Sequence, residues 1–143
     1  MHGINIFSGE KGLGGALTNP TELARKKGSI EEYYPVRYAA RNWPDVETAY
    51  HVLKTENTVE NDELMAELIA AKLRQHPTLM AQIEQRGGKE FLLLCSHFTG
   101  AKSEQAKSWE GQGLASRFIR NLVKGHDKAR HAVAMNFGQY SMF

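Results

Sequence analysis

A helix start is encoded in the stretch WPDVETAYHVLK, which spans residues 43–54. Pro44 suits the first position of a helix, because the backbone nitrogen is unpaired there and the φ angle of proline is already helical. With an advance of about 100° per residue, one side of this helix is apolar: Val46, Ala49 and Leu53. Glu47 and Lys54 then lie one above the other at the edge of the apolar side. We therefore expect a helix against the core that presents an acid and an amine to a cleft.

Upstream of this helix the sequence predicts short elements and a glycine-rich loop. Residues 4–7 alternate with the period of a short strand, and residues 33–38 predict a second strand that a proline restricts to a sheet edge. The glycines of residues 12–20 permit a flexible loop or a close approach to a ligand, without the spacing of a P-loop or a dinucleotide-binding motif. Residues 22–28 carry the basic triplet 25–27 and predict a solvated loop or a short helix.

Downstream, apolar side chains recur at helical spacing. The expected helices are residues 61–75, 77–88 and 114–124. Asn61 suits the N-cap of the first of them. Residues 91–97 form the most apolar segment, and their length leaves helix and strand both open. Residues 99–107 predict a polar loop, and residues 109–113 predict a turn rich in glycine. Residues 126–143 predict an additional helix followed by a docked or disordered end.

Length and composition indicate one globular domain over residues 1–143. The chain has 143 residues, of which 41% are hydrophobic and 24% charged, enough to bury a core. We expect a mainly α fold with a few short β-strands, with its core in residues 4–124 and the role of the tail, 125–143, left open. The formal charge of +2 neither demands nor excludes an anionic partner. With no export signal and no apolar run near the roughly 20 residues of a membrane helix, we expect a cytoplasmic protein without a membrane partner.

The usage of cysteine, histidine and serine argues against several kinds of site. The single cysteine, Cys95, excludes an internal disulfide, and its place in an apolar run predicts a buried, unreactive thiol. The six histidines are scattered, without zinc-ligand spacing or an H-E-x-x-H motif. No serine stands in a Gly-x-Ser-x-Gly elbow. We therefore expect no metal, no cofactor and no serine hydrolase.

Glycosidic chemistry is the enzyme class that the remaining side chains fit. Breaking a C–N or C–O bond at an anomeric carbon creates an oxocarbenium-like centre, which a carboxylate stabilises. Glu47 supplies this carboxylate, and Lys54 holds it ionised or binds a phosphate. Three aromatic side chains provide walls: Trp43, Tyr50 and Trp109. The alternative is a surface ion pair between Glu47 and Lys54, with both tryptophans in the core.

Residues 43–54 resemble the W-x-x-x-E-x-x-Y-x-x-x-K signature of the NADAR superfamily, also called YbiA-like proteins. Three other segments resemble parts of the same family, in the same order along the chain: Gly15-Ala16-Leu17-Thr18-Asn19, Tyr34-Pro35-Val36 and Trp109-Glu110-Gly111. The resemblance covers residues 4–123. It implies a YbiA-like multihelical single domain.

The resemblance also implies an N-glycosidase. Members of this family cleave ribosylamino-pyrimidine intermediates of riboflavin biosynthesis, releasing ribose 5-phosphate, or remove ADP-ribose from modified guanine in nucleic acid. It implies that Glu47 is the catalytic carboxylate and that Lys54 lines the ligand pocket, where we expect Lys54 to act in catalysis by orienting Glu47. It further implies a set of substrate-binding residues: Asn19, Trp43, Tyr50, Trp109 and Gly111. The alternative is a non-catalytic module that binds ADP-ribose or another nucleotide.

The chain departs from the family pattern in three places. Residues 20–32, with the basic triplet 25–27, are longer than in compact members and suit a phosphorylated nucleotide or a nucleic-acid strand. Residues 112–116 replace the asparagine and Leu-Gly that follow the late tryptophan in the family. The tail beyond Lys124 has no counterpart. The identity of the N-riboside therefore stays open, as does a third class of function, a protein–protein adaptor with both tryptophans in its core.

Overall fold

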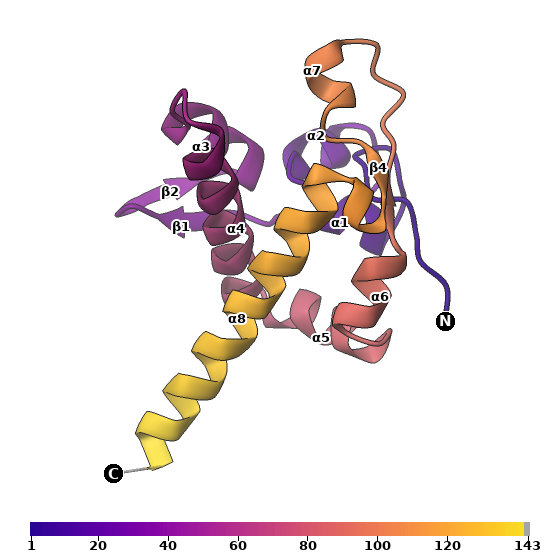
Figure 1. Ribbon diagram of the computed structural model, residues 1–143. Helices are drawn as coiled ribbons and strands as arrows, with labels where there is room; N and C mark the ends of the chain where they lie inside the picture. The colour runs from indigo at the N-terminus through magenta and orange to yellow at the C-terminus, as the bar shows by residue number, and fades with distance from the viewer. Residues whose placement is uncertain (142–143) are drawn as a thin grey trace.

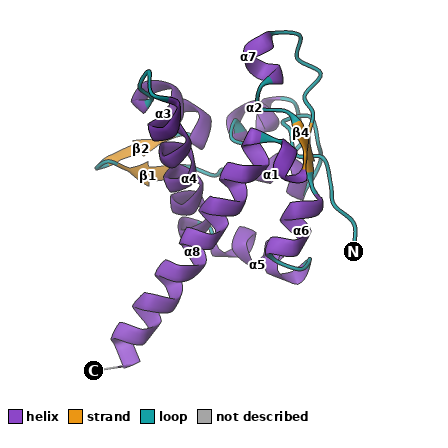
Figure 2. Ribbon diagram, viewed as in Figure 1, coloured by secondary structure: helices purple, strands orange, loops and turns teal. Residues whose placement is uncertain are grey.

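The computed structural model describes the backbone of residues 1–141 and the side-chain surroundings of residues 1–131. Helices dominate it and the strands are short (Figure 1, Figure 2). The described helices are α1 (Leu13–Leu17), α2 (Thr21–Lys26), α3 (Val46–Leu53), α4 (Thr58–Gln75), α5 (Pro77–Gln85), α6 (Lys89–Leu94), α7 (Glu104–Lys107), the 3-10 turn η1 (Gly113–Ala115) and α8 (Arg117–Ser141). The strands β1 (Val36–Tyr38) and β2 (Arg41–Trp43) pair antiparallel, as do β3 (Ser96–His97) and β4 (Gly111–Gln112). The expected mainly α fold with a few short strands is confirmed.

The centre of the fold is the packing of α8 against α4, the most extensive contact between two elements of the described chain. Figure 1 shows α8 running beside α4, with its C-terminal part projecting beyond the other elements. Gly125 of α8 permits the close approach, since a Cβ there would lie 2.6 Å from Cγ2 of Ile69 and 2.9 Å from the carbonyl oxygen of Ala66. The two helices also contribute fully buried core side chains: Met65, Leu68, Ile119 and Leu122.

Helix α3 begins at Val46, two residues after the proline that predicts its start. The side chain of Asp45 caps the helix, accepting hydrogen bonds from the backbone N–H of Thr48 at 2.9 Å and from its hydroxyl at 2.8 Å. An aspartate at the N-cap accepts from N–H groups of the first helical turn, which have no carbonyl partner within the helix. Pro44 therefore precedes the cap and does not occupy the first helical position.

The hairpin of β1 and β2 leads the chain into this cap. Residues 33–35 of the expected strand precede the ladder, which starts by pairing Val36 with Trp43. Ala39 and Ala40 form the two-residue turn with φ angles of 54° and 59°. Left-handed backbone at both positions matches the twist of a tight hairpin but strains residues that have a Cβ.

Four expected elements differ in the structure, two of them because of capping and pairing. The helix expected over 61–75 begins one turn earlier, since Asn57 caps it by accepting from the N–H of Glu60. The strand expected over residues 4–7 is a single bridge from Asn5 to Ser96. The glycine-rich stretch and the polar segment, both expected as loops, contain the short helices α1 and α7.

The apolar segment 91–97 is a helix followed by a strand. Helix α6 ends at Leu94, and Cys95 then adopts an extended conformation and leads into β3. Cys95 is fully buried, its Sγ lies 3.4 Å from the carbonyl oxygen of Phe91, and burial raises the pKa of its thiol. The prediction of a buried thiol is confirmed.

The last helix is longer than expected and starts later. Residues 113–115 form η1, and α8 begins only at Arg117, so Leu114 is 57% exposed. The helix then runs on to Ser141, which makes most of the expected tail part of α8. Residues 142–143, the very end of that tail, lie outside the described residues.

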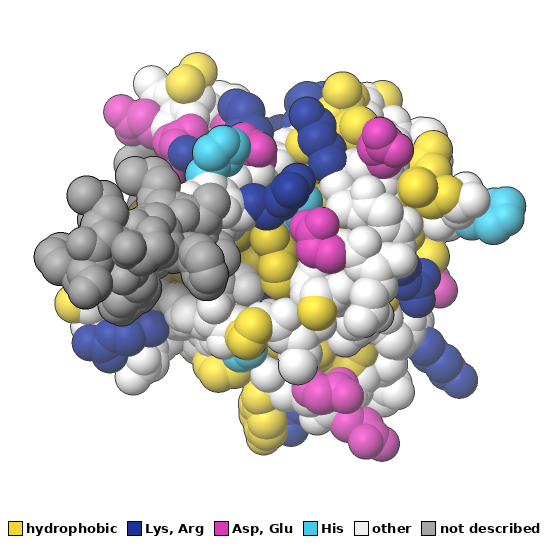
Figure 3. All heavy atoms as spheres, turned by 90° about the horizontal axis from the view of Figure 1, so that it is seen from below, with side chains coloured by type: hydrophobic (Ala, Val, Ile, Leu, Met, Phe, Trp, Pro, Cys, Tyr) yellow, Lys and Arg dark blue, Asp and Glu magenta, His cyan; other side chains and the backbone are white. Residues whose placement is uncertain are grey.

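The described surface is mixed in charge. On the face in Figure 3, side chains of both signs alternate with hydrophobic and uncharged ones, so the formal charge of +2 is not gathered into one patch on that face. Within residues 1–141, no helix combines the length and the apolar character that crossing a membrane requires.

The contact at Gly125 can be tested by adding one methyl group. Helix propensity alone favours Gly125→Ala by about 1 kcal/mol, but the new Cβ would meet Ile69 and the backbone of Ala66. Since overpacking costs about 1–3 kcal/mol, we expect a net loss of unfolding free energy in urea denaturation. Lys124→Ala, at the exposed neighbouring position, is the control that should leave stability almost unchanged; a more stable Gly125→Ala variant would refute the close contact.

Candidate functional site

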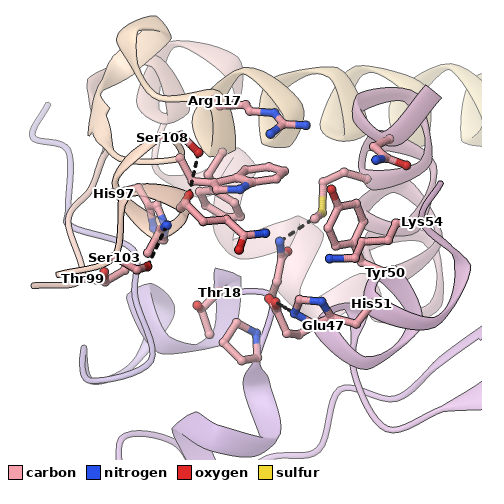
Figure 4. A pocket seen from close by; sticks show the side chains of 18 of the residues that line it. Thr18, Glu47, Tyr50, His51, Lys54, His97, Thr99, Ser103, Ser108 and Arg117 are labelled. Carbon is pink, nitrogen blue, oxygen red and sulfur yellow. Dashed lines mark hydrogen bonds and ion pairs between the residues drawn. The ribbon is translucent and has the colours of Figure 1, made fainter. Parts of the chain in front are cut away.

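A cavity of about 480 Å³ lies where segments far apart in the sequence meet (Figure 4). Its walls come from the loop before α2, from α3 and the loop after it, from the first turns of α4, from the chain between β3 and Trp109, and from the start of α8. Several hundred cubic ångströms is a typical size for a small-molecule site. The cavity is therefore the candidate functional site.

Five of the seven predicted site residues line this cavity: Asn19, Glu47, Tyr50, Lys54 and Trp109. In Figure 4, Glu47 and Arg117 lie on opposite sides of it, with Tyr50 and Lys54 toward one end and His97 toward the other. The structure thus brings together an acid, an amine, an amide and two aromatic rings from distant parts of the chain.

The other two predicted residues, Trp43 and Gly111, do not line the cavity. Trp43 is 4% exposed and donates from Nε1 to the carbonyl oxygen of Tyr38 at 3.0 Å, so it is a core side chain that fastens the hairpin. Gly111 lies in β4 with a φ of 152°, and a Cβ there would lie 2.8 Å from the backbone nitrogen of Ser116. Both residues support the fold around the cavity, but neither lines the cavity.

Glu47 lies in the first turn of α3, and its partner is a histidine. Its Oε1 is 2.6 Å from Nε2 of His51, and the Glu47 side chain is 34% exposed. The backbone N–H of Glu47 donates to the carbonyl oxygen of Asn19 at 3.3 Å, which joins α3 to the loop before α2. Lys54 does not pair with Glu47 as the helical wheel predicts, because α3 ends one residue before it and Lys54 itself is extended. Its Nζ lies instead 5.9 Å from the centre of the Tyr50 ring.

Trp109 is held in place by an aromatic and a cationic neighbour. The edge of Tyr50 meets it at a centroid distance of 5.8 Å, and the guanidinium of Arg117 lies 3.9 Å from the centre of its ring. Arg117 in turn donates from Nε to Oδ1 of Asp62 at 2.7 Å, and Asn121 donates to the same oxygen at 3.0 Å. Burial opposes ionisation of Asp62, but these two donors outweigh it and lower its pKa. Trp109 therefore presents an immobilised ring to the cavity.

His97 forms the opposite end of the cavity. Its Nδ1 lies 2.6 Å from the carbonyl oxygen of Ile6, which can only accept, so Nδ1 carries the proton and Nε2 is the acceptor of the neutral ring. The ring packs on Phe118 at a centroid distance of 4.6 Å. Burial lowers the pKa of His97 and favours this neutral form.

Three charged or ionisable side chains of the cavity, those of His51, His97 and Arg117, have no predicted role in the site. The spacing of four residues between Glu47 and His51 is a local signal that could have indicated their contact. Arg117 and His97 have no such signal, because their partners Asp62 and Ile6 are 55 and 91 residues away.

A buried lysine supports the loop that carries Asn19. Lys72 of α4 is 2% exposed and donates from Nζ to the carbonyl oxygens of Ala16 at 2.6 Å and of Thr18 at 2.8 Å. Burial lowers the pKa of its amine to about 7, against an opposing effect of Asp45. Asn19, 6% exposed, donates to the sulfur of Met65 at 3.0 Å, and its Oδ1 has no partner within the described structure.

The described residues contain no group of three or more histidine, cysteine, aspartate or glutamate side chains that could hold a metal ion. The chemistry available to the cavity from these residues is that of a carboxylate, two imidazoles, an amine, a guanidinium, amides and aromatic rings.

Comparison with known proteins found no matching family model, curated protein or solved structure. Membership of the NADAR superfamily therefore stays a prediction from the sequence.

The buried amine of Lys72 predicts a pH dependence of stability. Its pKa is about 7 in the folded chain and near 10.4 in an unfolded one, so the unfolded chain binds more protons between these values. The free energy of unfolding should therefore rise with pH over this window, by at most about 1.4 kcal/mol per pH unit, and this contribution should be flat below pH 7. Chemical denaturation of the wild type and of Lys72→Met from pH 6 to 10 measures it, and parallel pH profiles would contradict it.

Proposed function

We propose that the chain is an N-glycosidase, which hydrolyses the bond between the anomeric carbon of a ribose and a nitrogen of its base. The observation that carries the proposal is the convergence on one cavity of a carboxylate, an amine and an immobilised aromatic wall: Glu47, Lys54 and Trp109 with Tyr50. An aromatic wall suits a planar base, and a carboxylate suits the cation that forms at the sugar. The resemblance to the NADAR superfamily points to the same reaction.

Hydrolysis requires only the groups present and water. As the C1′–N bond breaks, its electron pair goes to the nitrogen, and positive charge spreads over C1′ and the ring oxygen. The ionised carboxylate of Glu47 stabilises this charge. A water oxygen then bonds to C1′, Glu47 accepts a proton of that water, and the departing nitrogen gains a proton overall. The products are a ribose with a free anomeric hydroxyl and the free base or amine.

Cationic groups at two places in the cavity favour a phosphorylated substrate. Lys54 lies at the end of α3, and Arg117 lies across the cavity from Glu47 (Figure 4). Arg117 uses its Nε for Asp62, and a guanidinium has four further N–H donors that suit phosphate oxygens. We assign to the cavity either a ribosylamino-pyrimidine phosphate or an ADP-ribosylated guanine, because both contain the same N-ribosidic bond.

Removing the charge of Glu47 tests the proposal. Glu47→Gln keeps the size of the side chain but can neither stabilise the cation nor accept a proton, so we expect the release of base to fall about 100-fold or more. Incubation with both substrate classes, with the released base measured by mass spectrometry, gives the rate. Glu56→Gln, an exposed change outside the cavity wall, is the control that should retain the wild-type rate.

Binding must be measured alongside the rate. Thermal shift with ADP-ribose and ribose 5-phosphate should show that Glu47→Gln still folds and binds. Undiminished turnover in this variant would refute the catalytic role of Glu47. Ligand binding without any turnover in the wild type would replace the enzyme by a nucleotide-binding module.

A further inference from the structure

The contact between Glu47 and His51 joins the acid and the imidazole of α3 that line the cavity. The distance from Oε1 to Nε2 is 2.6 Å, and Figure 4 shows the pair at the edge of the cavity. An ionised carboxylate can only accept, so a close approach of this kind requires a hydrogen on Nε2 of His51. The order along the helix is the favourable one, because an acid in the first turn and a base in the last turn both complement the helix dipole.

The energy of this pair is too small for a role in folding. The side chains are 55% exposed for His51 and 34% exposed for Glu47. Half-exposed pairs of this kind on a helix contribute little to stability, and less when salt screens them. Losing the contact should therefore leave the fold intact, and any large effect of losing it on the reaction would come from the position of the carboxylate.

The contact with His51 makes the two carboxylate oxygens of Glu47 different from each other. His51 engages Oε1, which restricts rotation of the carboxylate about its last bond. Oε2 is then the oxygen free to face C1′ and to accept the proton of the attacking water. Misplacing a reacting group by about 1 Å can cost on the order of 100-fold in rate, so one ion-pair contact to a half-exposed glutamate can control the reaction without binding the substrate.

We propose that His51 is a positioning residue, which acts through Glu47 by donating from Nε2 to Oε1 and leaving Oε2 for the water. This inference rests on the proposed N-glycosidase function. It assigns to His51 the orienting role that we expected of Lys54 from the sequence. The Nζ of Lys54 lies instead 5.9 Å from the centre of the Tyr50 ring. Lys54 then remains available to the substrate.

Two substitutions at one position test this role. His51→Leu removes the donor, and we expect kcat to fall about 10- to 100-fold while KM changes little. His51→Gln restores an N–H donor of similar reach, and we expect it to recover most of the lost kcat. His131→Leu is the matched control, since His131 also faces an acid four residues away, Asp127 at 3.6 Å, but on an exposed part of α8 outside the cavity wall.

The outcomes separate the two proposals. A wild-type chain that releases no base from either substrate class refutes the N-glycosidase and the positioning role together. A wild-type chain that turns over, with unchanged kcat in His51→Leu, refutes only the positioning role. A raised KM at constant kcat, or a Gln variant as slow as the Leu variant, also overturns it. Nitrogen-15 shifts of the His51 ring give an independent readout: a proton on Nε2 supports the pair, and a neutral ring protonated only on Nδ1 excludes it.

Discussion

The close packing of α8 on α4 is the contact on which the candidate site depends. Gly125 lets the two helices approach where any side chain would strike Ile69 or the backbone of Ala66. This approach places the start of α8 beside the first turns of α4, so that Arg117 reaches Asp62 at 2.7 Å. That ion pair holds the guanidinium over Trp109, and Trp109 becomes a wall of the cavity. The packing of two helices thus determines the orientation of an aromatic ring.

The opposite side of the cavity is organised by hydrogen bonds from a buried cation and a capping acid. Lys72 holds the carbonyl oxygens of Ala16 and Thr18, and Asp45 both caps α3 and accepts from the backbone N–H of Glu22 at 3.0 Å. The loop that bears Asn19 is therefore fixed from two sides. A charged amine in a fully buried position costs stability, and its lowered pKa is the measure of that cost. The chain retains it where loop carbonyls would otherwise lack donors.

Local patterns in the sequence predict the parts of the site that local rules control. The spacing of Glu47 and Tyr50 on one helix is enough to place both at the cavity. Lys54 also lines the cavity, but the helical wheel fails for its predicted contact with Glu47, because the helix ends one residue earlier and the periodicity ends with it. Local reasoning fails for Trp43 because a tryptophan beside a helix start is compatible with a ligand wall and with a core, and only the hairpin decides between them. Arg117 and His97 depend on partners that no spacing in the chain relates to them.

The single cysteine allows local opening of this structure to be followed by the rate of thiol alkylation. Cys95 is fully buried between α6 and β3, its backbone carbonyl accepts from Gly113 at 2.8 Å, and the next residues of the chain lead directly to His97 in the cavity wall. An alkylating reagent can reach its sulfur only when the packing between α6, β3 and the chain at Gly113 opens. Because the chain has no other cysteine, the rate of alkylation reports the opening of this packing. A ligand that contacts both His97 and the rest of the cavity would lower the rate of alkylation of Cys95. Its binding could then be detected without any assay of turnover.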